Sequence, residues 1–541
     1  MKLKIYQYAV GAIMLAAFTA CDFERVNTNE FEMLPEEGFM DAVAVGGSIT
    51  SMQKCVVPVG TQADGTNIAN EYQTAYNLAA DCWSGYFGQN NNWSGGYNNL
   101  TYYLIDSWIS NSYRQAYSNI LPLWQDVMQK SKEMNLPEVS ALAQILKISA
   151  WHKATDMFGP IPYKEAGKGL LVVPYDDQKT VYTTMLEELA EAIATLTDVA
   201  KKGDKVIPDF DAVYAGKADK WVIYANSLML RLAMRCRYAD EAMAQKYAEK
   251  AVKQEYGVMT QMADEAKMST GAGLTFINNL TVLSDQYNEC RMGMSMLSYL
   301  GGYEDPRIAK YFTQTDFEDA ITVANYGNYQ AIPPGSDVKQ NDKFKSFSRP
   351  NVTPTTPTYW MRASEVYFLR AEGKLYGWDM GSESDASLYS KGIAMSFEEN
   401  GVDADVNAYM QTDKQPLSTY FYVSDGVSLF YLRPIPTSST TQYTGTQEEK
   451  FEKIMTQKWI ALFPNGQEAW TEWRRTGYPK LLSNYRNNSG GSVTYEDGIR
   501  RMPYPRNSSL SADDQANLEK AVQMLEGGID SPSTRLWWDK K

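Results

Sequence analysis

The single histidine, His152, is the first residue to examine for chemistry, because imidazole is the side chain that most often transfers protons near neutral pH. It stands in WHKATDMFGPIPY (Trp151 to Tyr163), four residues before Asp156. One histidine cannot complete both a Ser-His-Asp site and a histidine-rich metal site, and no G-x-S-x-G, H-E-x-x-H or P-loop pattern is present. We therefore predict a packing or polar-facing role for His152, with no catalytic residue, no metal and no cofactor.

The end of this stretch is typical of helix termination. Gly159 can adopt a positive φ, Pro160 prevents the helix from continuing, and Pro162 favours an extended Tyr163. The segment before it has apolar residues at helical spacing, which places His152 on a helix that ends near Phe158.

Several other segments have the same helical spacing, and small residues such as Ala225 and Gly373 recur among bulky ones. Short gaps between them indicate helix pairs, although no strict 34-residue repeat is present. The predicted fold is mainly α, with tetratricopeptide-like helix pairs as a superhelical scaffold, an irregular loop-rich region and a few short strands. The apolar stripes run over 142–157, 182–196, 221–236 and 366–376, followed by a helix-like run over 386–397.

Composition limits the function. With 44% hydrophobic residues the chain can bury a large core, and its formal net charge of -14 repels polyanions, so we expect no nucleic-acid partner. The four cysteines after the N-terminal region, Cys55, Cys82, Cys236 and Cys290, are widely spaced and could be disulfides or free thiols.

The N-terminus, MKLKIYQYAVGAIMLAAFTACDFE, has two lysines and then a short apolar run, as an export signal does. Thr19, Ala20 and Cys21 resemble a bacterial lipobox, with Phe18 where leucine is usual. We expect residues 1–20 to be a lipoprotein signal peptide and Cys21 to carry the lipid that anchors the chain to a membrane. The alternative is an ordinary signal peptide that leaves Cys21 as a thiol.

Long polar stretches without helical period separate the helices, and such loops are often functional. Sugars lie with their C–H faces on aromatic rings and pair their hydroxyls with amides, so a glycan site needs exposed Trp or Tyr beside Asn or Gln. SGYFGQNNNWSGGYNNLTYY (84–103) has this combination. The predicted ligand-binding residues are Trp83, Tyr86, Phe87, Asn90, Asn92, Trp93 and Tyr97, with Tyr326 and Tyr329 from a second loop and Tyr359 and Trp360 as weaker candidates. The alternative is that these rings pack the loop onto the scaffold.

Several motifs resemble those of the SusD/RagB-like outer-membrane lipoproteins. TDMFGPIPYKEA (155–166) is similar to the branch with a D-x-x-G-P-I-P-Y turn, SEVYFLRAEGKLYGW (364–378) to a second hallmark helix, and YQAIPPG (329–335) to a loop before it. QKWIALFPNGQEAWTEWRRTGYPKL (457–481) and RRMPYPRNS (500–508) resemble the C-terminal hallmarks. We interpret the tandem Arg474 and Arg475 within them as structural ion pairing.

The resemblance implies a single domain over 21–541, lipid-anchored at the cell surface in the outer membrane. In this domain we expect helical scaffold mainly at 40–80, 106–255, 362–400 and 446–480, and irregular structure mainly at 81–105, 256–361 and 401–445. It also implies a non-catalytic protein that captures glycans or oligosaccharides and passes them to a SusC-like TonB-dependent transporter.

Two other functions stay open at this stage. A RagB-like protein would take up peptides, which offer backbone groups in place of ring faces. A glycoside hydrolase would need only two carboxylates, and Asp81 and Asp106 are the acids nearest the aromatic loop.

Overall fold

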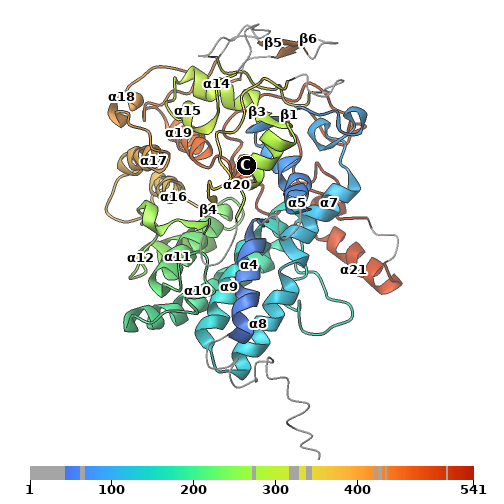
Figure 1. Cartoon of the computed structure of the whole chain (residues 1–541), viewed down its shortest axis with the longest axis vertical. Coiled ribbons are helices and arrows are strands. Elements are labelled where there is room, and N and C mark those ends of the chain that lie inside the picture. Colours follow the sequence, from blue (N-terminus) through green and yellow to red (C-terminus); the bar gives the residue numbers. More distant parts are fainter. Residues whose placement is uncertain are drawn as a thin grey trace, which may run out of the picture.

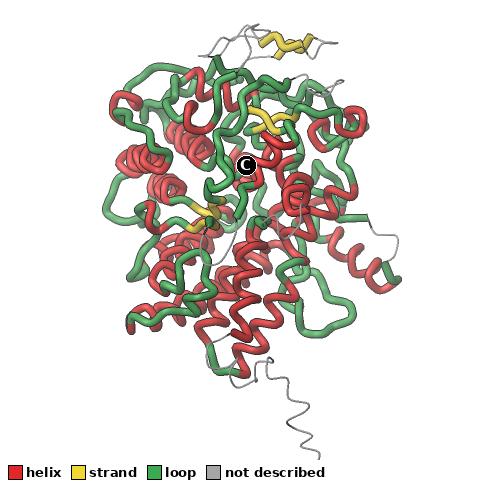
Figure 2. Tube along the Cα trace, in the orientation of Figure 1, coloured by secondary structure: helices red, strands yellow, loops and turns green. Residues whose placement is uncertain are grey.

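In the residues that the computed structural model describes, helices dominate and the sheets are short and two-stranded (Figure 1, Figure 2). The structure describes residues 43–60, 67–270, 276–315, 328–336, 344–417, 421–424, 429–432, 435–506 and 510–541. The mainly helical fold is therefore confirmed. Cys21 and Tyr326 lie outside the described residues.

The first half of the chain forms a scaffold in which neighbouring helices pack pairwise, in the lower part of Figure 1. Its helices are α4 (Val43–Val56), α8 (Leu121–Glu133), α9 (Pro137–Phe158), α10 (Gln178–Lys202), α11 (Ala218–Arg235) and α12 (Glu241–Lys253). The four predicted apolar stripes lie on α9, α10, α11 and α16 (Ala363–Leu375), and the run at 386–397 lies on α17 (Asp385–Glu399). These helix predictions are confirmed.

Local signals in the sequence set the helix ends. Asp177 accepts a hydrogen bond from the Thr180 backbone N–H at 3.0 Å and begins α10, and Gly203, at φ 74°, ends it. Gly159 has φ 89° and ends α9 as the sequence predicts. Each of these residues satisfies or redirects backbone groups that a helix end leaves unpaired.

The second half packs α16 against α17 and against α19 (Gln447–Ala461). Gly392 on α17 allows the close approach of the first two, because a Cβ there would lie 2.7 Å from the Phe368 ring. α20 (Gly466–Thr476) contacts the short helix α6 (Ala80–Trp83). The second half therefore touches the predicted glycan loop directly.

Shorter elements fill the remaining connections. The helices are α5 (Asn67–Tyr72), α7 (Asp106–Tyr113), α13 (Asn279–Thr281), α14 (Met294–Gly302), α15 (Ile308–Tyr311), α18 (Val406–Met410) and α21 (Ala512–Gln523). The strands β1 (Phe87–Gln89), β2 (Ala266–Met268), β3 (Cys290–Met292), β4 (Thr358–Met361), β5 (Phe421–Ser424) and β6 (Leu429–Leu432) pair as β1–β3, β2–β4 and β5–β6, all antiparallel. Helices α13, α14, α15 and α18 lie in stretches that we expected to be irregular.

Two clusters of buried apolar side chains hold the halves together, one centred on the scaffold helices and one on α14, α16, α17 and α19. The four cysteines after the N-terminal region are free thiols, which settles the alternative left open by their spacing. Within the described ranges, no helix has the length and apolarity needed to cross a membrane.

Candidate functional site

The predicted glycan loop is ordered by its own amides. Asn98 accepts from the Leu100 N–H at 3.0 Å and donates to the Trp93 carbonyl at 2.8 Å, and Trp83 Nε1 donates to the Asn99 carbonyl at 3.0 Å. Strand β1 fixes the first part of the loop against β3. Several of its asparagines therefore shape the loop, as turn residues do.

Three predicted site residues are buried in the second core. The Tyr86 side chain has no exposed surface, and its hydroxyl donates to the Trp459 carbonyl. Phe87 packs on Phe463 with ring centroids 5.5 Å apart, and Tyr329 is also buried. These rings are packed as core residues and lack the exposed face that a sugar needs, so we remove them from the candidate surface. The polar sequence around these three residues does not show whether their rings face solvent or the core.

Asn90 is likewise structural. Its Oδ1 accepts from the Phe344 N–H at 2.7 Å and its Nδ2 donates to the Asn288 carbonyl at 3.1 Å, and the side chain is buried. Asn92 and Trp93 are half-buried, and the Trp93 ring meets Trp108 edge-on with centroids 5.7 Å apart. Asn92 and Trp93 remain candidates, at the edge of the candidate site.

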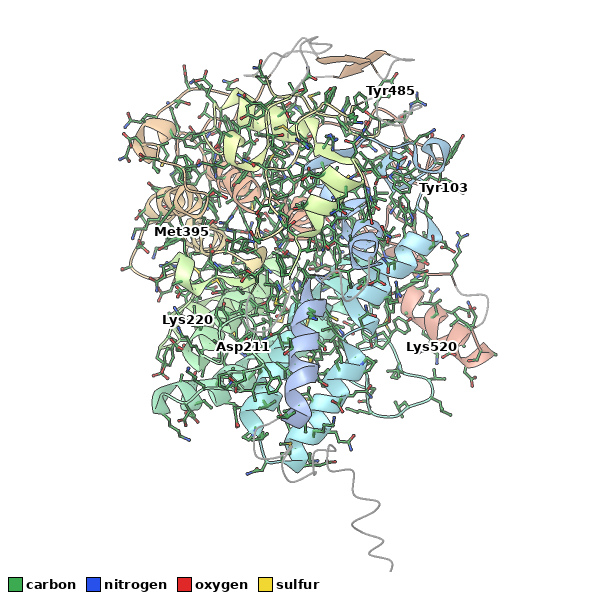
Figure 3. The ribbon with its side chains drawn as sticks, in the orientation of Figure 1. Tyr103, Asp211, Lys220, Met395, Tyr485 and Lys520 are labelled. Atoms are coloured by element: carbon green, nitrogen blue, oxygen red, sulfur yellow. The ribbon has the colours of Figure 1, made fainter. Side chains whose placement is uncertain are left out.

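The aromatic face that the loop exposes consists of Tyr97 and Tyr103. They are 56% and 48% exposed and meet edge-on at 5.6 Å, so each ring supports the other while offering a face to solvent. Tyr97 is a predicted site residue that the structure places at the surface. Figure 3 shows Tyr103 and Tyr485 on the same side of the molecule.

A C-terminal segment, 481–499, docks onto this loop. Asn484 Nδ2 donates to the Leu100 carbonyl at 2.7 Å, Asn488 Nδ2 donates to the Gly96 carbonyl at 2.8 Å, and the Asn488 N–H donates to the Thr101 carbonyl at 2.7 Å. Segments nearly 400 residues apart therefore form one surface.

The two segments enclose a cleft of about 530 Å³, which includes space open to solvent. Its walls include Trp83, Tyr102, Trp473 and Tyr495, with Asn484 and Glu496 among the polar groups. A smaller hollow of about 320 Å³ adjoins it, because Trp83, Pro334 and Asn484 border both. We call the larger hollow the Trp83–Tyr495 cleft. Of these rings Tyr495 is exposed and Trp83 and Trp473 are half-buried, and together with Asn484 they give the cleft ring faces beside an amide, the combination that glycan binding requires.

A family model for SusD-like proteins, described as SusD and RagB outer membrane lipoproteins, matches residues 25–539. The chain belongs to this family. SusD-like proteins are non-catalytic outer-membrane lipoproteins that bind carbohydrate in polysaccharide utilisation. The predicted family, the outer-membrane lipoprotein location and the absence of catalysis are confirmed, whereas the branch with the D-x-x-G-P-I-P-Y turn and exposure at the cell surface stay predictions.

Solved structures agree. A chitin-binding SusD homolog from Flavobacterium johnsoniae is 35% identical, with a TM-score of 0.82 over 92% of this chain and 98% of that one. A SusD homolog from Bacteroides thetaiotaomicron is 32% identical (TM-score 0.80; 92% and 99% covered), and one from Bacteroides uniformis is 32% identical (TM-score 0.81; 92% and 99% covered). A search of curated proteins found no match.

The motif residues of this SusD-like protein form a buried ion network. Arg235 on α11 pairs with Asp156 at 2.6 Å and with Glu472 at 3.0 Å, and Arg475 joins Glu472 to Glu372, each at 2.7 Å. The prediction that Arg475 makes structural ion pairs is confirmed, whereas Arg474 donates mainly to the backbone carbonyls of 156 and 500. The hallmark segments thus join the two halves of the fold.

His152 is part of this structural region. It is buried, and its Nδ1 lies 3.4 Å from Asp156 Oδ2. Burial lowers the pKa of His152 to about 4, although Asp156 opposes this effect. The imidazole is therefore neutral at physiological pH and packed inside the scaffold.

The two acids considered for a hydrolase, Asp81 and Asp106, lie in different environments. Asp81 is buried and accepts from the Tyr72 hydroxyl at 2.8 Å, and burial raises the pKa of Asp81 to about 6. Asp106 is exposed at the start of α7. Neither lines the Trp83–Tyr495 cleft. In the part of the chain that the structure describes, no group of three His, Cys, Asp or Glu side chains could hold a metal.

Titration of the lone histidine gives a direct test of its burial. We expect the His152 imidazole signal in NMR to titrate near pH 4 in protein without a histidine tag. Between pH 6.5 and 4 the unfolded chain binds a proton that the folded chain does not, so the free energy of unfolding falls by about 3 kcal/mol as the pH drops through this window.

Asp81 acts in the opposite sense, since its raised pKa favours the folded state below about pH 6. We therefore compare the free energy of unfolding of the parent with that of His152→Gln at each pH. The variant removes only the histidine contribution, so the difference isolates it. If the NMR titration of the His152 imidazole in the folded protein has its midpoint near pH 6.5, His152 is not a buried structural residue.

Trp473, Asn484 and Tyr495 line the cleft, and Tyr485 follows Asn484 in the chain, but none of the four was among the predicted site residues. A signal was available, because RNNSGGSVTY (486–495) repeats the asparagine, glycine and tyrosine composition of QNNNWSGGYN (89–98). Two segments of the same unusual composition indicate two walls of one surface.

Proposed function

We propose that this SusD-like protein captures oligosaccharides at the Trp83–Tyr495 cleft and the adjoining Tyr97–Tyr103 face, and passes them to a SusC-like TonB-dependent transporter. The observation that supports the proposal is a hollow lined by rings from two distant segments, half-buried Trp83 and exposed Tyr495, beside the polar groups of Asn484 and Glu496. Ring faces such as that of Tyr495 hold the apolar side of a sugar, and polar groups such as the Glu496 carboxylate pair with its hydroxyls.

The first ligands to test are N-acetylglucosamine oligosaccharides, because the F. johnsoniae relative is described as chitin-binding and is 35% identical. The test is isothermal titration calorimetry of the lipid-free protein with these and other oligosaccharides. Binding of at least one, lost on Trp473→Ala and kept in an exposed control such as Leu171→Ala, supports the proposal.

A peptide ligand is the alternative outcome. Short peptides that co-purify with the transporter complex, together with no response to any glycan, would replace the oligosaccharide with a peptide. Co-purification of the native protein with a large outer-membrane transporter tests the partner independently of the ligand.

We also propose that residues 1–20 are removed and that Cys21 carries the lipid anchor of a single domain over 21–541. Cys21→Ala is expected to abolish incorporation of a labelled fatty acid and to release the protein from the membrane fraction. Labelled lipid on Cys21→Ala would show that another residue is acylated.

A further inference from the structure

Large apolar side chains that face solvent are of two chemical kinds in the described residues. The aromatic ones are Tyr97, Tyr103, Tyr485 and Tyr495, and the aliphatic ones are Leu170, Leu171, Met524 and Ile529. The tyrosines belong to the two segments of the proposed glycan surface. An aliphatic side chain has neither a ring face nor a polar atom to offer a sugar, so glycan binding does not explain the second kind.

Leu170 and Leu171 lie at the tip of the loop between α9 and α10, in KGLLVVP (168–174). Leu171 is fully exposed and Leu170 is 48% exposed, and the two valines that follow are half-buried. Exposed aliphatic residues in succession are unfavourable in water and mark a contact surface where a protein keeps them. We call residues 168–172 the leucine tip.

The body of the protein holds the leucine tip at both of its ends. Gln125 Nε2, on α8, donates to the Gly167 carbonyl at 2.9 Å, and Asn517 Nδ2, on α21, donates to the Val173 carbonyl at 2.6 Å. Gly167 and Gly169 have φ of 82° and 78°, which turns the chain between these two contacts. Figure 1 shows this loop beside α8 and below α21. The two leucines are therefore presented outward from a fixed base.

The helix that holds the base of the tip also holds the start of α4. Lys130 Nζ, on α8, donates to the Ala44 carbonyl at 3.2 Å. Lys130 lies five residues after Gln125, which is about 7.5 Å along the helix axis. The chain that leads to Val43 contains Cys21, the proposed site of the lipid anchor. The anchored chain thus enters the described body close to the leucine tip, and a weak contact of the tip with the bilayer can form because the anchor keeps the two surfaces near each other.

A lipid bilayer fits the shape and chemistry of the tip. Leu171 projects with its whole side chain uncovered, and fluid hydrocarbon accommodates a projecting side chain, whereas a folded partner needs a complementary surface. Leucine is among the residues most favoured in hydrocarbon. Lys164 and Lys168 are exposed beside the tip, and the long stem of a lysine can place its charge among the head groups. Lys168 pairs with Glu165 at 3.0 Å, so the contact is mainly apolar.

We propose that the leucine tip is a second membrane contact, which inserts Leu170 and Leu171 into the leaflet that holds the lipid anchor. The inference rests on the proposed anchor at Cys21 and is independent of the glycan surface. It fixes one side of the scaffold against the bilayer, which a single flexible attachment does not do.

The probe is a nitroxide spin label on Leu171→Cys in the lipidated protein, reconstituted into phosphatidylcholine vesicles. Oxygen concentrates in hydrocarbon and a nickel chelate stays in water, so the ratio of their collision rates with the label reports its depth. We expect this ratio to rise several-fold relative to the lipid-free protein in solution. The parent, treated in the same way, gives the background from its four free thiols.

The matched control is a label on Asp403→Cys, in the exposed connection between α17 and α18, where the collision ratio is expected to stay as it is in water. Adding Leu170→Asp to the protein labelled at position 171 is expected to return the ratio to its value in water, because hydrocarbon excludes a carboxylate. Leu170→Met is expected to keep the raised ratio. The side chain of Leu170 makes little contact with the core, so urea denaturation should show unchanged stability in both variants.

The proposal is overturned if the vesicle-bound protein has the same ratio at positions 171 and 403, or if Leu170→Asp has no effect. It is also overturned if the label at 171 is already shielded in the lipid-free protein that keeps residues 22–42, because that segment then covers the tip. Shielding that appears only when the transporter is added would assign the tip to a protein contact instead. If the protein stays in the supernatant, the anchor at Cys21 fails and this inference with it, a result distinct from bound protein with a wet tip.

Discussion

Replacing Glu472 by alanine is expected to lower the free energy of unfolding by about 3–5 kcal/mol, the cost of removing one partner from a buried ion network. Glu472 contacts three cations: Arg235 at 3.0 Å, Arg475 at 2.7 Å and Lys458 at 2.9 Å. Burial opposes its ionisation, but these cations outweigh burial and hold the pKa of Glu472 well below its usual range. Removing the carboxylate takes from Lys458 its carboxylate partner and takes one partner from each arginine, while Arg235 keeps Asp156 and Arg475 keeps Glu372.

Urea denaturation of the lipid-free protein measures this effect. The matched control is Glu255→Ala, which breaks the exposed pair of Glu255 with Lys201 and is expected to cost less than about 1 kcal/mol. Glu472→Gln keeps the shape and some hydrogen bonds, so we expect an intermediate loss. Equal effects of Glu472→Ala and Glu255→Ala would show that the network does not hold the two halves together.

The second large effect is expected on ligand binding. The double variant Tyr97→Ala/Tyr103→Ala removes both exposed rings of the loop, and each ring is expected to contribute about 1 kcal/mol to a stacked sugar, so affinity falls at least tenfold. Because both side chains are largely exposed, the free energy of unfolding should change little.

Leu171→Ala removes a fully exposed apolar side chain from a different loop and is expected to bind as the parent does. Calorimetry with the best oligosaccharide of the panel measures both variants. If the tyrosine variant binds normally while Trp473→Ala does not, the ligand occupies the cleft without reaching Tyr97 and Tyr103. The proposed binding surface is then the cleft without the Tyr97–Tyr103 face.

The helices could be predicted from sequence because their apolar residues repeat at a spacing that only a helix places on one face. Leu142 to Met157 became α9, and Tyr182 to Leu196 became α10. The end of α9 was also predictable, since Gly159 and Pro160 act on the backbone next to them. These are local effects, and local sequence carries them.

The site was predicted less well because exposure depends on distant partners. Nothing in 84–103 reveals that Tyr86 faces Trp459, more than 370 residues later, or that Tyr97 faces solvent. Trp83 lies in the cleft because α20 and the 481–499 segment cover its other side. An aromatic residue in a polar loop is thus ambiguous until the elements that pack on it are known.

The docking of 481–499 onto 96–101 has a consequence for how the protein matures. The segment at 481–499 is synthesised nearly 400 residues after the loop at 96–101 on which it docks, so a product that terminates between them lacks one wall of the cleft. The cleft is therefore complete only after its C-terminal wall has been made and has docked.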